Sequence, residues 1–191
     1  KTGKINSITE DFTYIYFGTD EGGILRYHLF QNMFDEPITQ AQGLSSNQVM
    51  AVHYDSETGT LWAATNAGLN YSFTREGSWE VINYGDLGLA KNTTVYQIGS
   101  SRAYIWINAG TSFFKLDRIS GILLGVFMIP DEDDINWSSG LSKGGIQISD
   151  DIVNYAVAEG WLLNGNYFID PFGKNIRITS YYLTQYSDIW L

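Results

Sequence analysis

The chain has 191 residues, with 11 basic and 21 acidic side chains and a formal net charge of −10. This balance argues against a nucleic-acid partner, which requires a basic face for the phosphates, and no apolar run is long enough for insertion into a membrane. The absence of cysteine excludes disulfides and thiolate-bound metals, and 15% aromatic residues with 20 glycines and 3 prolines predict an all-β fold.

One pattern occurs four times along the chain: an aromatic strand, a short turn with glycine and a second aromatic strand. The copies are residues 14–27, 61–71, 105–114 and 161–168. Their turn glycines recur at intervals of about 40–55 residues, a period typical of the four-stranded blades of a β-propeller. The pattern therefore predicts an all-β propeller of about four blades, with the start of a fifth.

The predicted blades follow one another without a separate domain between them. Their ranges are 5–42, 47–85, 93–129 and 146–179, with an insertion at 130–145 and the start of the next blade at 180–191. The segment 176–182 fits either the outer strand of the fourth blade or the inner strand of the next. A propeller avoids exposed sheet edges by closing its ring. We therefore expect part of a larger propeller, completed by the remainder of its ring or by another copy.

The second copy shows the four strands of a blade most clearly. Alternating apolar and polar residues, separated by turns rich in Gly, Asp, Asn and Ser, predict strands at 48–54, 60–65, 69–73 and 79–84. The first of these would be the innermost strand and the last the outer strand.

Residues 43–69 also carry a family resemblance. They read Gly43-Leu-Ser-Ser-Asn47-Gln-Val49, then Asp55, then Gly59-Thr-Leu-Trp62-Ala-Ala-Thr65-Asn-Ala-Gly68-Leu69. This segment resembles the two-component regulator propeller repeat, apart from Ala64, where the repeat has glycine. The resemblance implies a multi-bladed propeller in the extracytoplasmic region of a bacterial sensor, or in a secreted or cell-surface protein. It also implies a non-enzymatic module that recognises a ligand or another protein.

Large aromatic residues of the repeat are candidates for the wedges between neighbouring blades. We assign this role to Phe17, Trp62, Trp106 and Trp161. Truncation of such a buried side chain to alanine costs about 3–5 kcal/mol. These residues define the scaffold and do not identify a ligand.

One end of the predicted propeller is the candidate ligand-binding surface. There the turns between second and third strands should meet the loops at 43–47, 85–93 and 130–145. The candidate binding residues are Asn47, Asn66, Asn108, Asp131, Asp133, Asp134, Trp137 and Asn164. Trp137 is either tucked onto a blade or exposed for a partner. A protein or carbohydrate ligand suits these residue types.

No catalytic residue emerges from the sequence. The two histidines, His28 and His53, lie in predicted strands, and Ser142 of Gly140-Leu-Ser-Lys-Gly144 is followed by no histidine. No cofactor is expected, except that the acidic loop at 131–134 is a candidate for weak calcium binding. Two other functions remain open: a structural or secretion-machinery propeller that binds only protein, and a polysaccharide lyase or glycosidase with carboxylates at its axial channel.

Overall fold

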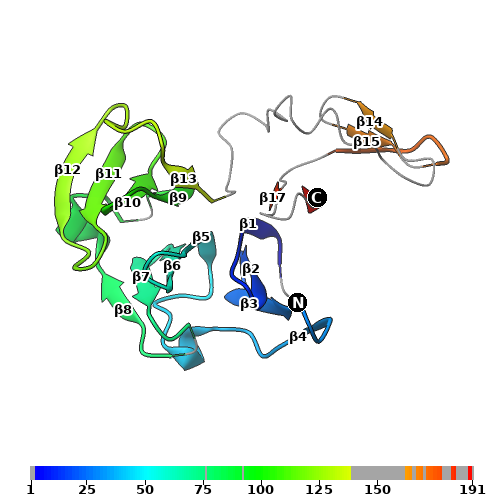
Figure 1. The fold of residues 1–191 in the computed structure, drawn as a ribbon, viewed down its shortest axis with the longest axis horizontal. Coiled ribbons are helices and arrows are strands. Elements are labelled where there is room, and N and C mark those ends of the chain that lie inside the picture. The colour runs from blue at the N-terminus through cyan, green and yellow to red at the C-terminus, as the bar shows by residue number, and fades with distance from the viewer. Residues whose placement is uncertain are drawn as a thin grey trace. The chain divides into compact units, whose positions relative to one another are not determined.

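The computed structural model describes residues 3–75, 77–91, 93–138, 162–164, 167–169, 171–177, 182–183 and 189–190. It divides into two compact units, Lys1–Leu141 and Ser142–Leu191. Among the described residues the only helices are two short 3-10 helices, so the predicted all-β class is confirmed (Figure 1). None of the described helices is long and apolar enough to cross a membrane.

The first unit contains three antiparallel meanders, each with its strands in sequence order. The first sheet consists of β1 (Ile5–Glu10), β2 (Tyr14–Thr19), β3 (Ile24–His28) and β4 (Met33–Phe34). The second sheet consists of β5 (Val49–Asp55), β6 (Thr60–Thr65), β7 (Leu69–Ser72) and β8 (Glu80–Ile82). The third consists of β9 (Gln97–Ser100), β10 (Tyr104–Asn108), β11 (Phe113–Asp117) and β12 (Leu123–Phe127), with β13 (Asn136–Trp137) added beside β9.

The connections between the sheets contain the 3-10 helices η1 (Gln40–Gln42) and η2 (Tyr84–Leu87). The tight turn between β2 and β3 depends on Gly23, whose φ is 73°. A Cβ at this position would lie 2.1 Å from the carbonyl oxygen of Ile38, so the close approach of the next connection requires glycine.

The sheets pack face to face, with β1 beside β5 and β5 beside β9. One apolar cluster joins the first two sheets, where Tyr16 packs with Val52 and Leu61. A second cluster joins the next two sheets, where Trp62 packs with Ile98 and the rest of the third sheet's apolar face. Sequential four-stranded sheets stacked in this way are consistent with propeller-like blades.

Polar side chains on β1 also bond to the backbone of β5. The Ser7 hydroxyl accepts a hydrogen bond from the Val52 amide at 3.0 Å, and the Thr9 hydroxyl accepts one from the Tyr54 amide at 2.9 Å. Because these groups are buried, each bond satisfies atoms that would otherwise be costly to remove from water. The innermost strands are therefore held in register by hydrogen bonds as well as by packing.

The assignment of Phe17 as the counterpart of Trp62 and Trp106 is wrong, and the counterpart is Tyr16. Tyr16 lies opposite Thr9, two residues before Asp11, as Trp62 lies opposite His53, two residues before Asp55. Successive strand residues face opposite sides of a sheet, so Phe17 points away from the second sheet. Tyr16, Trp62 and Trp106 are all among the largest fully buried side chains.

The second unit contains a sheet with the order β14 (Leu162–Asn164), β15 (Tyr167–Ile169) and β16 (Asn175–Arg177). Because β16 pairs with β15, the strand near residue 176 continues that sheet. A separate pair is formed by β17 (Tyr182–Leu183) and β18 (Ile189–Trp190). The predicted blade aromatic Trp161 and the Ser142 segment lie outside the described residues.

Candidate functional site

The predicted asparagines of the first two sheets lie where the connecting loop 43–48 meets two hairpin turns. The Asn47 carbonyl accepts a hydrogen bond from the Gly23 amide at 2.9 Å, and its side chain accepts one from the Gln40 amide at 2.8 Å. The Asn66 side chain donates to Gln48 Oε1 at 2.9 Å. We call this region, with the turns β2–β3, β6–β7 and β10–β11, the loop end of the sheets.

Two buried residues fasten the connecting loop to the second sheet. The Asn70 side chain accepts a hydrogen bond from the Ser45 amide at 2.9 Å, and the hydroxyls of Ser45 and Thr65 lie 2.8 Å apart. The Tyr84 hydroxyl donates to the Thr65 carbonyl at 2.5 Å, and burial raises the pKa of Tyr84. Ser45 and Thr65 of the repeat motif therefore shape the loop end, and the exposed amide groups of Asn66 and Gln48 form part of its surface.

Asn108 lies at the loop end of the third sheet, where its side chain makes hydrogen bonds that stabilise the β10–β11 turn. Its Nδ2 donates to Gln97 Oε1 at 3.0 Å, and its Oδ1 accepts from the Gly110 amide at 2.8 Å. Asn164 is the last residue of β14, in the second unit. The structure therefore brings Asn47 and Asn66 together, whereas Asn108 belongs to a separate turn.

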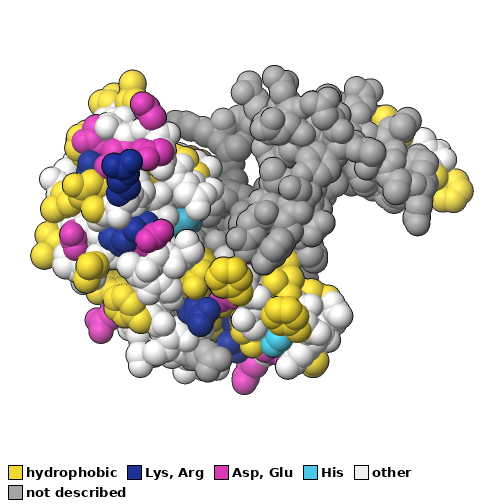
Figure 2. Space-filling model, in the orientation of Figure 1, with side chains coloured by type: hydrophobic (Ala, Val, Ile, Leu, Met, Phe, Trp, Pro, Cys, Tyr) yellow, Lys and Arg dark blue, Asp and Glu magenta, His cyan; other side chains and the backbone are white. Residues whose placement is uncertain are grey.

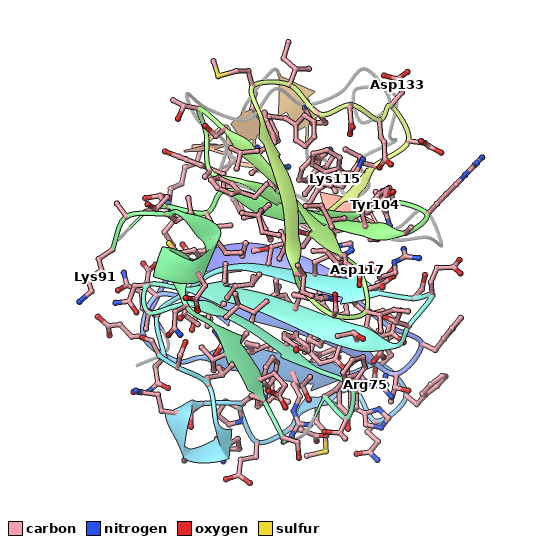
Figure 3. All side chains as sticks on the ribbon, turned by 90° about the vertical axis from the view of Figure 1, so that its left-hand side faces the viewer. Arg75, Lys91, Tyr104, Lys115, Asp117 and Asp133 are labelled. Carbon is pink, nitrogen blue, oxygen red and sulfur yellow. The ribbon has the colours of Figure 1, made fainter. Side chains whose placement is uncertain are left out.

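The predicted residues 131–137 are not at the loop end. Residues 130–138, which we call the strap, cross the face of the third sheet that carries Trp106 and Lys115. Glu132 in the strap accepts a hydrogen bond from Ser101, which lies in the β9–β10 turn at the end of the sheet opposite Asn108. The expected convergence of Asp131, Asp133 and Asp134 with the asparagine turns is therefore not found. Asp133, labelled in Figure 3, and Asp134 are both exposed to solvent.

The strap places two carboxylates around a lysine in an aromatic setting. Lys115 Nζ lies 2.9 Å from Asp131 Oδ1, 3.4 Å from Glu132 Oε1 and 4.0 Å from the centroid of the Tyr104 ring (Figure 3). Burial alone would lower the pKa of Lys115, but the hydrogen bond to Asp131 and the charge of Glu132 outweigh it and raise the pKa. The ammonium group therefore stays charged, and both of its carboxylate partners belong to the same chain.

Trp137 is tucked onto the sheet, which decides between the two alternatives for this residue. It is half-buried, and its ring meets Phe113 edge to face at 5.9 Å. A Cβ on Gly99 would lie 2.8 Å from Trp137 Cε3, so the tryptophan rests on the bare backbone of β9.

Two ion pairs join neighbouring sheets through residues that are not among the predicted site residues. Asp11 pairs with Arg75 of the second sheet, and Asp55 pairs with Arg118 of the third at 3.0 Å. Both aspartates come directly at the end of an innermost strand, and Asp55 belongs to the repeat motif, which was the available signal. Their arginine partners lie more than 60 residues away, so local sequence patterns do not reveal them.

His53 and Ser100 form a further contact between the second and third sheets. His53 Nε2 lies 2.9 Å from Ser100 Oγ, and both residues are buried. Burial, with a smaller contribution from the Arg118 charge, lowers the pKa of His53 to about 3, so the ring is neutral at physiological pH. A serine–histidine pair enclosed between two sheets has no access to substrate, and its evident role is structural.

The described residues contain no group of three or more His, Cys, Asp or Glu side chains placed to hold a metal ion. Asp131 is engaged with Lys115. Calcium binding at residues 131–134 stays a prediction.

Comparisons with known proteins support the fold. No protein-family model and no curated protein matches the chain. Among solved structures, the extracellular domain of the putative hybrid two component system BT4673 from B. thetaiotaomicron matches 63% of this chain with a TM-score of 0.51 and 16% identity. A structure described as the extracellular domain of the putative one component system BT4673 matches 98% with a TM-score of 0.53 and 14% identity.

The extracellular domain of the putative hybrid two component system BT3049 from the same organism matches 100% of this chain, with a TM-score of 0.52 and 13% identity. The chain spans only 16–26% of the length of these three structures. At these identities the likeness establishes a shared fold, and this chain has the fold of a part of these extracellular domains.

Proposed function

We propose that the chain is part of a β-propeller that serves as a non-enzymatic recognition module in the extracytoplasmic region of a bacterial sensor or surface protein. The observation that carries this proposal is the fold similarity over 98–100% of the chain to the extracellular domains of two putative sensor systems. The motif at residues 43–69 supports the same assignment, because it resembles the repeat of two-component regulator propellers.

The proposed ligand surface is the loop end of the sheets, around Asn66 and Gln48. Their amide groups offer both donors and acceptors and are exposed, while the loop beneath them is fixed by Asn47, Ser45 and Asn70. A preorganised surface of neutral amides suits the hydroxyl groups of a carbohydrate or the backbone of a peptide. The ligand class we propose is therefore a neutral glycan or a protein segment.

A recognition role fits the state of the buried carboxylates better than glycoside cleavage does. In the first unit Asp11 and Asp55 are each paired with an arginine between two sheets. A glycosidase requires two carboxyl groups that flank a substrate in an open cleft. The pairing of these aspartates favours the non-enzymatic proposal over a lyase or glycosidase.

A propeller that binds only protein is the second candidate function, and the surface of β12 favours it. Leu124 and Val126 on this outermost strand, and Ile122 directly before it, are more than half exposed. Exposed apolar patches on soluble proteins mark interaction sites.

The ligand surface is tested by titrating the chain with a panel of neutral oligosaccharides, using heat of binding and one-dimensional NMR as readouts. We expect Asn66→Ala to weaken binding at least several-fold, whereas Asp133→Asn, an exposed change in the strap, leaves it unaltered. Cleavage of an oligosaccharide during the titration would contradict the non-enzymatic proposal. Equal loss of binding in both variants would contradict the location of the surface.

A further inference from the structure

A repeated contact fastens each of the first two sheets to the sheet that follows. In the first sheet, Asp11 Oδ1 accepts hydrogen bonds from the amides of Thr13 and Tyr14 at 2.6 and 2.7 Å. Its Oδ2 accepts the Tyr16 hydroxyl at 2.7 Å and the guanidinium of Arg75. One buried carboxylate thus organises the first turn of its own sheet, satisfies the central aromatic residue and binds a cation from the next sheet.

In the second sheet, Asp55 binds its own turn and a cation from the next sheet but not the central aromatic residue, because Trp62 Nε1 has no hydrogen-bond partner among the described residues. Asp55 accepts the Thr58 hydroxyl at 2.7 Å and the Glu57 amide at 3.3 Å, and Arg118 Nε lies 3.0 Å from its Oδ2. Arg75 and Arg118 correspond to each other, because each follows the third strand of its sheet. We call this contact the latch.

The third sheet lacks the aspartate of the latch. Ser101 occupies the position, since its amide donates to the Tyr104 carbonyl at 3.0 Å as the Asp11 amide donates to the Tyr14 carbonyl at 2.9 Å. Serine carries no charge, so the position alone cannot bind a cation or balance one.

Glu132 of the strap supplies the missing carboxylate. Its Oε2 accepts hydrogen bonds from the Ser101 hydroxyl and from Trp106 Nε1, the latter at 3.0 Å, and its Oε1 lies 3.4 Å from Lys115 Nζ. Trp106 occupies the position of Tyr16, whose hydroxyl donates to Asp11. Turn residue, central aromatic and cation are therefore all bound by a carboxylate, as in the first sheet.

The third sheet also has room for the strap where the second sheet carries a side chain. Gly99 lies opposite Trp106 as His53 lies opposite Trp62. A Cβ on Gly99 would lie 2.8 Å from both Ile135 Cγ2 and Trp137 Cε3. Ser138 fixes the end of the strap beside β9, because its amide and hydroxyl both donate hydrogen bonds to the Ile98 carbonyl, at 3.0 and 2.7 Å.

We propose that Glu132 takes the role that Asp11 and Asp55 have in the first two sheets. Through this carboxylate the strap covers the Trp106 face of the third sheet with a segment of the same chain. Glu132 replaces the aspartate, and Lys115 replaces the arginine that a following sheet provides to the first two. The strap is thus a segment held on this face by specific contacts. The sequence of residues 131–134 alone indicates only an acidic loop exposed to solvent.

The experiment measures peptide-resolved hydrogen exchange on the full 191-residue chain. We expect Glu132→Gln to speed amide exchange at least tenfold in β10, the β9–β10 turn and residues 130–138, because Lys115 and Trp106 lose their carboxylate. Asp133→Asn, one residue away and exposed, is the matched control and should leave exchange unchanged. Wild-type exchange in Glu132→Gln would overturn the proposal.

Two further variants separate a latch from a general loss of stability. Ser101→Asp in the Glu132→Gln background places a carboxylate at the position that Asp11 and Asp55 have in the first two sheets and should return protection to the β9–β10 turn. Ser101→Asp alone should displace Glu132, so that residues 130–138 exchange faster while the turn stays protected. The proposal would be overturned if the double variant is no better protected than Glu132→Gln. It would also be overturned if the strap of the Ser101→Asp variant exchanges as in the wild type.

Discussion

The central aromatic residue of each sheet is the point at which single side chains contribute most to stability. Trp62 is almost completely buried and stacks on Tyr71 with ring centroids 4.7 Å apart. Trp106 is equally buried and contacts Phe127. Trp137 is only half-buried, on the outside of the same sheet.

We therefore predict that Trp62→Ala and Trp106→Ala each lower the free energy of unfolding by about 3–5 kcal/mol, because each leaves a cavity between strands. Trp137→Ala should cost about 1 kcal/mol or less, since its site is open to water on one side. Urea unfolding followed by far-ultraviolet circular dichroism measures all three. Similar losses for the three variants would contradict the burial order.

His53 makes the stability of the first unit depend on pH. Its pKa is about 3 in the folded chain and near 6.5 when exposed, so between these values the unfolded state binds the additional proton. Stability is therefore complete above pH 6.5 and falls on acidification, by about 1.4 kcal/mol at most for each pH unit toward 3.

The prediction is that His53→Gln has a shallower loss of stability between pH 6.5 and 4.5 than the wild type. Asn66→Ala, an exposed change that removes no titratable group, serves as the control and should keep the wild-type slope. Urea midpoints at pH 7.5, 5.5 and 4.5 provide the comparison. Identical slopes for wild type and His53→Gln would show that the buried ring does not govern this range.

At the scale of strands and turns, the latch between Asp55 and Arg118 joins the second and third sheets. Both side chains are nearly inaccessible, with 1% and 10% exposure. Removing one partner of a buried pair leaves the other charge without compensation, which costs about 3–5 kcal/mol.

We expect Asp55→Asn to destabilise the chain by that amount, whereas Asp86→Asn, an exposed change in η2, should have an effect within about 0.5 kcal/mol. Combining Asp55→Asn with Arg118→Gln should cost less than the sum of the single changes, because the second change removes the uncompensated charge. Additive losses would show that the two residues act independently.

The elements that the sequence predicts well are those with a local signal. The strand at residues 60–65 is found as β6 with the same bounds, because alternating side chains and the flanking turns determine it. The outer strand predicted at 79–84 is shorter, Glu80–Ile82, since Tyr84 begins η2 and reaches back to the Thr65 carbonyl.

Features that depend on distant partners were not predictable. β13 has two residues, and only its pairing with β9, more than 30 positions earlier, makes it a strand. A match by residue type alone favours Phe17 as the counterpart of Trp62. The spacing from Tyr16 to Thr19, which equals that from Trp62 to Thr65, identifies Tyr16. The placement of Asp131 away from the asparagine turns likewise depends on Lys115.

At the scale of the whole first unit, the outer edges of the three sheets differ in their protection. β4 has two residues and is followed by Asp35, Glu36 and Pro37, while β8 has three residues and includes Glu80. β12 has five residues, Leu123–Phe127, and none is charged. Charges, prolines and short length are three of the devices that keep edge strands from pairing with other chains. β12 has none of them, and Figure 2 shows hydrophobic side chains along the margin where Figure 1 places this strand.

We predict that the chain self-associates through β12. Two copies can pair their β12 strands antiparallel. This pairing brings no like charges together, despite the net charge of −10 of each chain. It also covers Leu124 and Val126, each of which is more than half exposed. Sedimentation velocity at increasing concentration should show a dimer for the wild type. Leu124→Lys and Val126→Lys should each shift it to the monomer by placing two lysines side by side, whereas Val81→Lys on β8 should leave association unchanged. A monomer at every concentration, or a dimer that tolerates lysine in β12 as well as in β8, would contradict this contact.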